Sequence, residues 1–365
     1  MTPVDGRVFA KYLRRSGASP RFGADFCRAV VIPACDEAAE LPRTLDSLEL
    51  ALAAATRRTA VIVVVNHPPG ASELPSLEML RLLEERKTPG LFVIYAPGMT
   101  GGVGAARKLG MDTFVAAHTA ESIDDTVIWS LDADTRVEPE YFARVEAAFA
   151  AHPGAGFCTL GFRHERGETP ELERAIREYE EYLREYVEKL RRAGSPYAFH
   201  SIGSAFAVRG SAYVRAGGMK VRSAGEDFYF LQECAKCGAF FEFDNVLVHP
   251  SARLSGRNAF GTGPALEKIL AGKALNRISP AAFDALATLL GAARDPELAA
   301  DPERLSAAVP EAVRVFLVSC RFAENWNRIL ANTPRDPAAR ERAFHRWFDG
   351  LKTLRLLHAL TAAKR

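Results

Sequence analysis

The sequence has no uninterrupted apolar run of the about 18 residues that a membrane-spanning helix requires. Its strongest run, residues 60–65, has only the length of a strand. An excess of charge of one sign is also lacking, because 47 Lys and Arg residues nearly balance 45 Asp and Glu residues. The whole-chain charge therefore gives no electrostatic reason to expect a nucleic-acid partner.

Cysteine is scarce, with six residues scattered over 365, and the first residues, MTPVDGRVFAKYLRR, lack the apolar core of a secretory signal. These absences favour reduced thiols in a cytoplasmic protein. Peripheral membrane contact stays open, because Arg355 and Lys364 flank a leucine-rich stretch near the end of the sequence. A helix packed on its own domain is the simpler interpretation of that stretch.

The first half of the sequence alternates short β-branched runs with helical patterns. This rhythm predicts βαβ units and a mainly parallel sheet flanked by helices, which is an α/β fold. In such a sheet the loops at the carboxyl ends of the strands form the ligand crevice. The predicted strands cover residues 29–33, 60–65, 91–95 and 126–131, and the predicted helices cover residues 41–55, 77–86 and 105–118.

The second half contains longer helical patterns. A helix is expected to begin at Pro170 and to end before Gly194, and strands over residues 201–209 and 239–248 enclose a helix over residues 226–236. From Pro264 onward the patterns are helical throughout. The predicted domains are an N-terminal extension over residues 1–25, a catalytic domain over residues 26–263 and a helical C-terminal region over residues 264–365.

Two carboxylates, Asp132 and Asp134, are spaced two residues apart and follow the mainly apolar segment VIWSL at residues 127–131. On the turn after a strand, both can point toward one divalent cation, which prefers hard oxygen ligands and can bridge the phosphates of a nucleotide diphosphate. Alone, the Asp-x-Asp pattern is a weak signal. A helix-capping Asp with a solvated neighbour is its structural alternative.

Three further motifs accompany this pair in the sequence. They are VVIPACDE at residues 30–37, GGVGAARKLG at residues 101–110 and GED at residues 225–227. In kind and order, the four motifs resemble those of glycosyltransferase family 2 over about residues 29–263. The resemblance implies a nucleotide-diphospho-sugar transferase fold of the GT-A type. It also implies an inverting, metal-dependent sugar transfer to an acceptor hydroxyl in glycan or glycolipid synthesis, with Mn²⁺ or Mg²⁺ as the cofactor.

The resemblance also implies which residues bind the nucleotide part of the donor. Pro33, Cys35 and Glu37 would line the nucleotide pocket. Gly104 and Arg107, from the glycine-rich segment, would lie near the base and the diphosphate.

The remaining motif residues would carry the chemistry. Asp134 would hold the metal directly, Asp132 would reach the donor ribose or a metal-bound water, and Ala133 between them would belong to the donor site. Asp227 would be the general base that takes the proton of the acceptor hydroxyl, with Glu226 as its supporting neighbour. For that pair, the first turn of a helix is the structural alternative, because carboxylates are favoured there.

The sequence departs from the family pattern at several positions. Asn66 stands where an acid usually follows the second strand, and its amide can offer a donor and an acceptor to a base edge, which leaves the nucleotide base open. His249 follows a later strand, where related enzymes supply a third metal ligand, with a structural histidine as the alternative. Arg253 and Arg257 would clamp the donor diphosphate.

The expected activity is that of a hexosyl- or N-acetylhexosaminyl-transferase acting on a small, glycan or lipid-linked acceptor. A nucleotide-sugar or glycan-binding module without turnover is the alternative, suggested by Asn66 and by Cys35 in place of an aromatic residue. A dehydrogenase is disfavoured because the glycine-rich segment follows the third strand rather than the first. A nucleotidyltransferase is disfavoured because the loop after the first strand is acidic.

Overall fold

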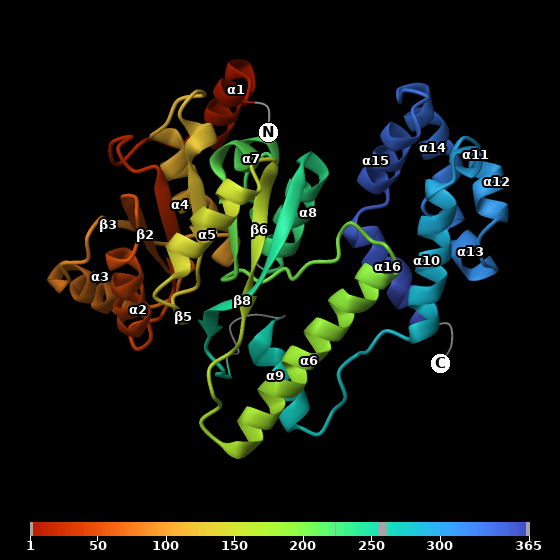
Figure 1. Cartoon of the computed structure of the whole chain (residues 1–365). Helices are drawn as coiled ribbons and strands as arrows, with labels where there is room; N and C mark the ends of the chain where they lie inside the picture. The colour runs from red at the N-terminus through yellow and green to blue at the C-terminus, as the bar shows by residue number, and fades with distance from the viewer. Residues whose placement is uncertain (1–2, 223, 255–260, 363–365) are drawn as a thin grey trace. The chain divides into compact units, whose positions relative to one another are not determined.

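Two compact units make up the chain in the computed structural model, which describes residues 3–222, 224–254 and 261–362. The first unit contains Met1–Arg177 and Ser201–Gly272, and the second contains Glu178–His200 and Lys273–Arg365 (Figure 1). This division by internal contacts groups residues 178–200 with the C-terminal helices, and the domain boundaries predicted at residues 26 and 264 stay predictions.

The first unit is built on a mixed sheet that, within the described residues, has eight strands in the order β3-β2-β1-β4-β7-β6-β8-β5. Strands β1 to β4 pair in parallel, and β6 pairs with β8 in parallel. Strand β7 runs antiparallel to β4 and β6, and β5 runs antiparallel to β8. The strands are β1 Arg28–Ala34, β2 Thr59–Asn66, β3 Leu91–Ala96, β4 Val127–Ser130, β5 Thr135–Val137, β6 Ala155–Phe162, β7 Phe206–Arg209 and β8 Ala239–Pro250.

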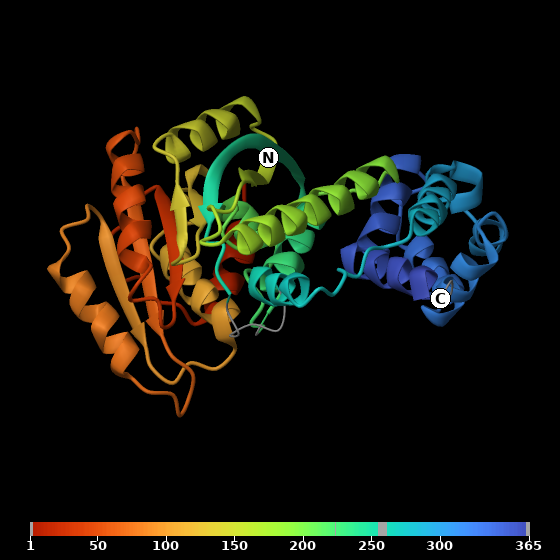
Figure 2. The same ribbon diagram turned by 90° about the horizontal axis from the view of Figure 1, so that it is seen from below.

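The central strands β1 and β2 are mainly apolar, with polar residues only at their ends. Every residue of β1 and β2 is buried, as expected for parallel strands covered on both faces. Figure 2 shows α2 and α3 on one face of the sheet and α4 on the other. Gly110 of α4 allows close packing there, because a Cβ at this position would lie 2.4 Å from Val31 Cγ1.

The helices of the first unit connect and cover these strands. The N-terminal helix α1 is anchored by Tyr12, whose hydroxyl donates to Asp112 Oδ1 at 2.5 Å, and Tyr213 donates to the same oxygen at 2.6 Å. The helices are α1 Gly6–Ser16, α2 Leu41–Ala53, α3 Leu74–Glu85, α4 Gly102–Ala116, the 3-10 helix η1 Ile123–Asp125, α5 Tyr141–Ala151, α6 Pro170–Arg192, α7 Gly210–Arg215, α8 Glu226–Cys237 and α9 Thr262–Leu270.

The second unit is helical. Among its described residues, the C-terminal part of α6 and seven further helices enclose a core in which Trp326, Phe344 and Phe348 have no exposed surface. None of the described helices is both long and apolar enough to cross a membrane. The further helices are α10 Pro280–Arg294, α11 Pro296–Ala299, α12 Pro302–Ala307, α13 Glu311–Ser319, α14 Phe322–Ala331, α15 Pro337–Trp347 and α16 Gly350–Ala362.

The α/β class and the helical C-terminal region predicted from the sequence are confirmed. Strands β1 to β4 and helices α2 to α4 correspond to the predicted elements, and α6 begins at Pro170 as predicted. The strand predicted over residues 201–209 is shorter and begins at Phe206. Its first residues form a loop, because the Gly203 carbonyl accepts hydrogen bonds from Arg107 and Ser130 instead of pairing in the sheet.

Candidate active site

The candidate site lies where the carboxyl ends of β1 and β4 meet. Strands β2 and β3 extend the sheet from β1 in one direction and β4 extends it in the other, so the strand order reverses at this point. Open α/β sheets bind ligands at such a crevice. Glu37 follows β1, Asp132 and Asp134 follow β4, and the first turn of α8 supplies Glu226 and Asp227.

A buried guanidinium joins the acidic residues on the inner side of the site. The side chain of Arg107 is only 2% exposed. Burial lowers the pKa of Arg107, but the carboxylates of Asp132 and Glu226 outweigh that effect and raise it. Arg107 donates to Asp132 Oδ1 at 2.8 Å, Glu226 Oε1 at 3.3 Å, Ser130 Oγ at 2.6 Å and Gly203 O at 3.1 Å.

This geometry gives the glycine-rich segment a role that the sequence did not predict. Arg107 was expected near the base and the diphosphate, but with so little exposed surface it holds protein carboxylates in place instead. Gly104 lets α4 pass close to α8, because a Cβ on Gly104 would lie 2.6 Å from Arg222 O and 3.0 Å from Glu226 Cβ. In this arrangement both residues position the acidic pair, and direct donor binding by Gly104 or Arg107 stays a prediction.

The Glu226–Asp227 pair opens α8. Glu226 is buried, and Asp227 Oδ1 accepts a hydrogen bond from Phe228 N at 2.7 Å. Burial, together with the neighbouring Glu226 carboxylate, raises the pKa of Asp227 to about 7. A helix N-terminus by itself would favour the charged carboxylate and lower the pKa. The raised pKa therefore separates Asp227 from an ordinary first-turn carboxylate and suits a general base at neutral pH.

A second guanidinium joins the acidic residues on the outer side of the site. Arg253 Nη2 lies 2.5 Å and 2.6 Å from the two carboxylate oxygens of Glu37, and Arg253 Nε lies 3.0 Å from Asp134 Oδ2. The backbone supports this contact, because Ser251 N donates to Asp134 O at 3.1 Å. Burial lowers the pKa of Arg253, but Asp134 and Glu37 raise it further than burial lowers it.

The donor set at Asp132 and Asp134 fits a divalent cation in part. Two carboxylates at the mouth of the crevice are suitable oxygen ligands, and a cation that also binds donor phosphates needs few protein ligands. Within the described ranges, no group of three His, Cys, Asp or Glu side chains is arranged to hold a metal. The positive charge beside Asp134 is that of Arg253, 2.9 Å from Oδ2.

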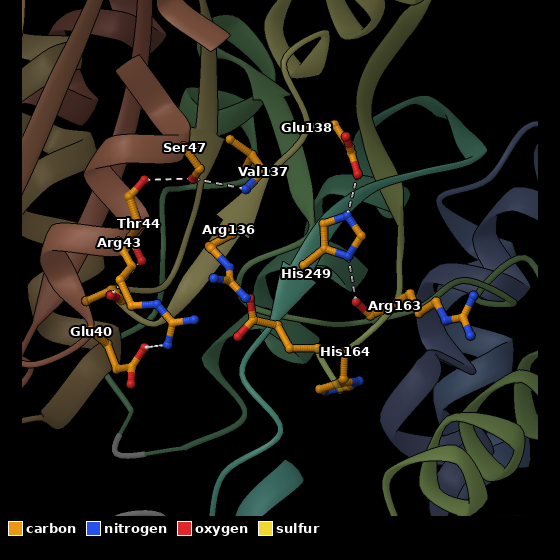
Figure 3. Close-up of polar contacts among 12 residues, drawn as sticks. Glu40, Arg43, Thr44, Ser47, Arg136, Val137, Glu138, Arg163, His164 and His249 are labelled. Atoms are coloured by element: carbon orange, nitrogen blue, oxygen red, sulfur yellow. Dashed lines mark hydrogen bonds and ion pairs between the residues drawn. The ribbon is translucent and has the colours of Figure 1, made fainter. Parts of the chain in front are cut away.

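His249 lies on β8, opposite Arg136 of β5. Its Nε2 is 2.7 Å from Glu138 Oε1 and its Nδ1 is 3.0 Å from Arg163 O (Figure 3). With both ring nitrogens facing oxygen acceptors, the imidazole links three strand ends and is not grouped with Asp132 and Asp134. Metal ligation by His249 stays a prediction that requires the ring to leave one of these contacts.

Asn66 ends β2 and is buried. Its Nδ2 donates to Ala34 O at 3.2 Å and to Val64 O at 3.1 Å, so its amide nitrogen ties the ends of β1 and β2 together. In this arrangement, the amide nitrogen that was expected to hydrogen-bond to a nucleotide base donates to backbone carbonyls at the edge of the crevice instead. Recognition of a base by Asn66 stays a prediction.

The other predicted donor residues lie around the same strand ends. Pro33 is buried within β1, and Cys35 is half-buried just after it. Ala133 is buried, and its carbonyl accepts a hydrogen bond from Thr44 Oγ1 at 2.8 Å, which fixes the turn between Asp132 and Asp134. Arg257 lies outside the described residues.

A hollow of about 620 Å³, which was not predicted from the sequence, lies beside the glycine-rich segment. Val221, which lines it, lies next to the start of α4, since a Cβ on Gly101 would lie 2.3 Å from Val221 Cγ1. Within it, the Arg222 guanidinium lies 3.6 Å from the centroid of the Tyr229 ring. The sequence signal that could have indicated this hollow is Tyr229, an aromatic residue two positions after Asp227. The hollow is lined by Lys220, Val221, Arg222, Tyr229, Gln232 and Glu233.

The family model described as Glycosyl transferase family 2 matches residues 29–215. Among solved structures, S. aureus TarS 1-349 in complex with UDP-GlcNAc is 14% identical with a TM-score of 0.49, covering 83% of this chain and 90% of that chain. Mannosyltransferase PcManGT from Pyrobaculum calidifontis, in complex with GDP-Man and Mn²⁺, is 15% identical with a TM-score of 0.43, covering 96% and 95%. No curated protein matches significantly. The family model alone carries the assignment.

Proposed function

We propose, from the premise that this chain belongs to glycosyl transferase family 2, that it moves a sugar from a nucleotide diphosphate donor to an acceptor hydroxyl. Glycosyl transfer and the GT-A type of fold follow from the family, and the donor and acceptor classes are our proposal. The observation that carries it is the Arg107 guanidinium, which holds Asp132 on the donor side and Glu226 beside Asp227 on the acceptor side.

In the proposed reaction, Asp227 takes the proton from the acceptor hydroxyl while the hydroxyl oxygen forms a bond to the anomeric carbon. The bond from that carbon to the diphosphate oxygen breaks, and its electron pair leaves with the diphosphate. Attack from the face opposite the leaving group inverts the anomeric centre. An Asp227 with a pKa of about 7 is charged in a large fraction of molecules at neutral pH and is basic enough to accept the proton.

Asp134 would hold a divalent cation, Mn²⁺ or Mg²⁺, with Asp132 reaching a metal-bound water or the donor ribose. When bound, the cation stabilises the negative charge of the leaving diphosphate. Arg253 and Arg257 would clamp that diphosphate. Both predicted carboxylates lie at the crevice, which supports this arrangement.

Pro33, Cys35, Glu37 and Asn66 would surround the nucleotide at the ends of β1 and β2. The sugar would be a hexose or an N-acetylhexosamine. The acceptor, whether a small molecule, a glycan or a lipid-linked sugar, would approach Asp227 from the side of the hollow that Tyr229 lines.

Release of the nucleotide diphosphate from a panel of nucleotide sugars, measured with Mn²⁺ present, tests this function. We expect one donor to be turned over by the wild type, and turnover to be lost in Asp227→Asn while the donor still binds. A wild-type chain that binds a nucleotide sugar without releasing the diphosphate to water or to any acceptor would favour a binding module without catalysis.

A further inference from the structure

Two arginines divide the acidic residues of the site between them. Arg107 bridges Asp132 and Glu226, whereas Arg253 bridges Asp134 and Glu37. The outer bridge joins residues that are far apart in the sequence, because Arg253 is 216 residues from Glu37. Four carboxylates of the site, those of Asp132, Glu226, Asp134 and Glu37, are therefore paired with a guanidinium.

The two bridges differ in how easily a ligand can reach them. The Arg107 side chain is 2% exposed and also donates to Ser130 Oγ and Gly203 O, so moving it would leave several buried groups without partners. The Arg253 side chain is 32% exposed, and the Asp134 carboxylate that it contacts is 24% exposed. The guanidinium of the outer bridge is therefore open to solvent, whereas that of the inner bridge is enclosed and only its Asp132 partner, 36% exposed, reaches solvent.

The outer bridge conflicts with metal binding at the same carboxylate. Arg253 Nη2 lies 2.9 Å from Asp134 Oδ2, close to where a cation ligated by that oxygen would lie. Two cations on one carboxylate repel each other, and the repulsion is strong in a partly buried site because solvent screens it weakly. A metal on Asp134 Oδ2 therefore requires Arg253 to move away from that oxygen.

Glu37 allows that movement without exposing an unpaired charge. The Glu37 side chain is buried and receives two contacts from Arg253, at 2.5 Å and 2.6 Å, whereas Asp134 receives its contacts at 2.9 Å and 3.0 Å. Arg253 can release Asp134 and still keep its closer partner. Its remaining N–H groups would then be available to an anion in the crevice.

We propose that Arg253 is a resident counter-cation of Asp134, that a divalent cation displaces it, and that the displaced guanidinium pairs with the donor diphosphate. This inference rests on the proposed function, because it assigns a resting position to a diphosphate-binding residue. It makes metal and diphosphate binding cooperative. The metal alone binds weakly against Arg253, and a diphosphate favours binding by giving the guanidinium a new partner.

Binding of Mn²⁺ alone, followed by electron paramagnetic resonance of the free ion, tests the displacement. In Arg253→Gln, we expect Mn²⁺ to bind about tenfold more tightly than in the wild type, a change within the usual range of coupling between sites. The matched control is Arg43→Gln, which removes the same charge from a side chain that is 51% exposed and pairs with Glu40 (Figure 3). The control should change Mn²⁺ affinity less than about twofold, as expected for an exposed charge.

Inorganic pyrophosphate with saturating Mn²⁺ tests the second half of the proposal by calorimetry. Arg253→Gln should bind pyrophosphate about tenfold more weakly than the wild type, since it lacks the charge-assisted contact. Arg253→Lys, which keeps the charge without the forked geometry, should lie between the two in both measurements. It also serves as the second variant if the Gln substitution does not fold, as judged by circular dichroism.

Unchanged or weaker Mn²⁺ binding in both Arg253 variants would overturn the displacement, and unchanged pyrophosphate binding would overturn the new pairing. These measurements need no sugar transfer. A chain that shows the predicted Mn²⁺ and pyrophosphate affinities but turns over no nucleotide sugar would contradict the proposed function. The displacement of Arg253 by the metal would still be supported.

Discussion

Arg107 Nη2 lies 2.8 Å from Asp132 Oδ1, at the centre of the inner bridge. In Arg107→Lys the charge remains, but one ammonium cannot reproduce the contacts of the planar guanidinium with Asp132 and Glu226. We expect turnover to fall by about 100-fold, as is typical when a reacting group is misplaced by about 1 Å, together with a lower melting temperature.

Steady-state kinetics and thermal unfolding measure both effects. Arg81→Lys is the control, because Arg81 is an exposed residue of α3 that pairs with Glu85 on the same helix. Full activity in Arg107→Lys would show that the inner bridge does not position the acidic pair.

The pKa of Asp227 predicts how the rate depends on pH. Since burial and Glu226 raise this pKa to about 7, kcat/KM should rise with pH until the carboxylate is fully charged and then level off above that value. In Asp227→Asn, the rise of kcat/KM with pH should be absent, and the rate should fall by about 100- to 10,000-fold. A rate that is independent of pH between about 5 and 8 in the wild type would remove Asp227 from the role of general base.

The same pKa predicts how stability depends on pH. The pKa of Asp227 is about 7 in the folded chain and about 3.9 in an unfolded chain. The folded state therefore binds the proton more tightly, and this stabilising contribution is complete below about pH 4 and is lost as the pH rises through about 7. Asp227→Asn resembles the protonated form, so its melting temperature should exceed that of the wild type by more at pH 8 than at pH 5.

Glu173→Gln provides a comparison of opposite sign. A side-chain hydrogen bond from Arg177 lowers the pKa of Glu173, so its contribution is present above the unfolded pKa and is lost as the pH falls. Thermal unfolding at several pH values distinguishes the two behaviours. A parallel response of Asp227→Asn and Glu173→Gln would contradict the assigned direction for Asp227.

Gly104 is predicted to control the distance between α4 and the first turn of α8. Gly104→Ala would place a Cβ 2.6 Å from Arg222 O, and a backbone oxygen cannot move as easily as a flexible side chain. We expect kcat to fall at least about tenfold through displacement of Glu226 and Asp227. Gly154→Ala is the matched control, because nothing lies within 4 Å of its added Cβ. Equal kinetics for the two variants would refute this role.

Much of the fold could be predicted from the sequence, because β1 and β2 are long apolar runs that only buried parallel strands accommodate. The N-terminal helix α1, the three-residue β5 and the strand β6 were missed. Residues 155–162 read AGFCTLGF, in which two glycines interrupt the apolar pattern. These residues form a strand because they pair with β7 and β8, which lie in distant parts of the chain.

The grouping of acidic residues in the candidate site could be predicted from the sequence, but the partners of these residues could not. Local motifs identified Asp132, Asp134 and Asp227, since each follows a strand or opens a helix. The burial of Arg107 and the contact of Arg253 with Glu37 depend on tertiary packing over large separations in sequence. Sequence patterns within one segment carry no information about such contacts.

Thermal stabilisation of the wild type and Asp134→Ala by a panel of nucleotide diphosphate sugars, with and without Mn²⁺, tests whether Asp134 holds a metal at the donor site, because a ligand that binds the native state raises its melting temperature. We expect one donor to stabilise the wild type, and we expect this stabilisation to depend on Mn²⁺ and to be lost in Asp134→Ala. Failure of every donor to stabilise the wild type, or equal stabilisation of Asp134→Ala, would contradict a donor and metal site at these carboxylates.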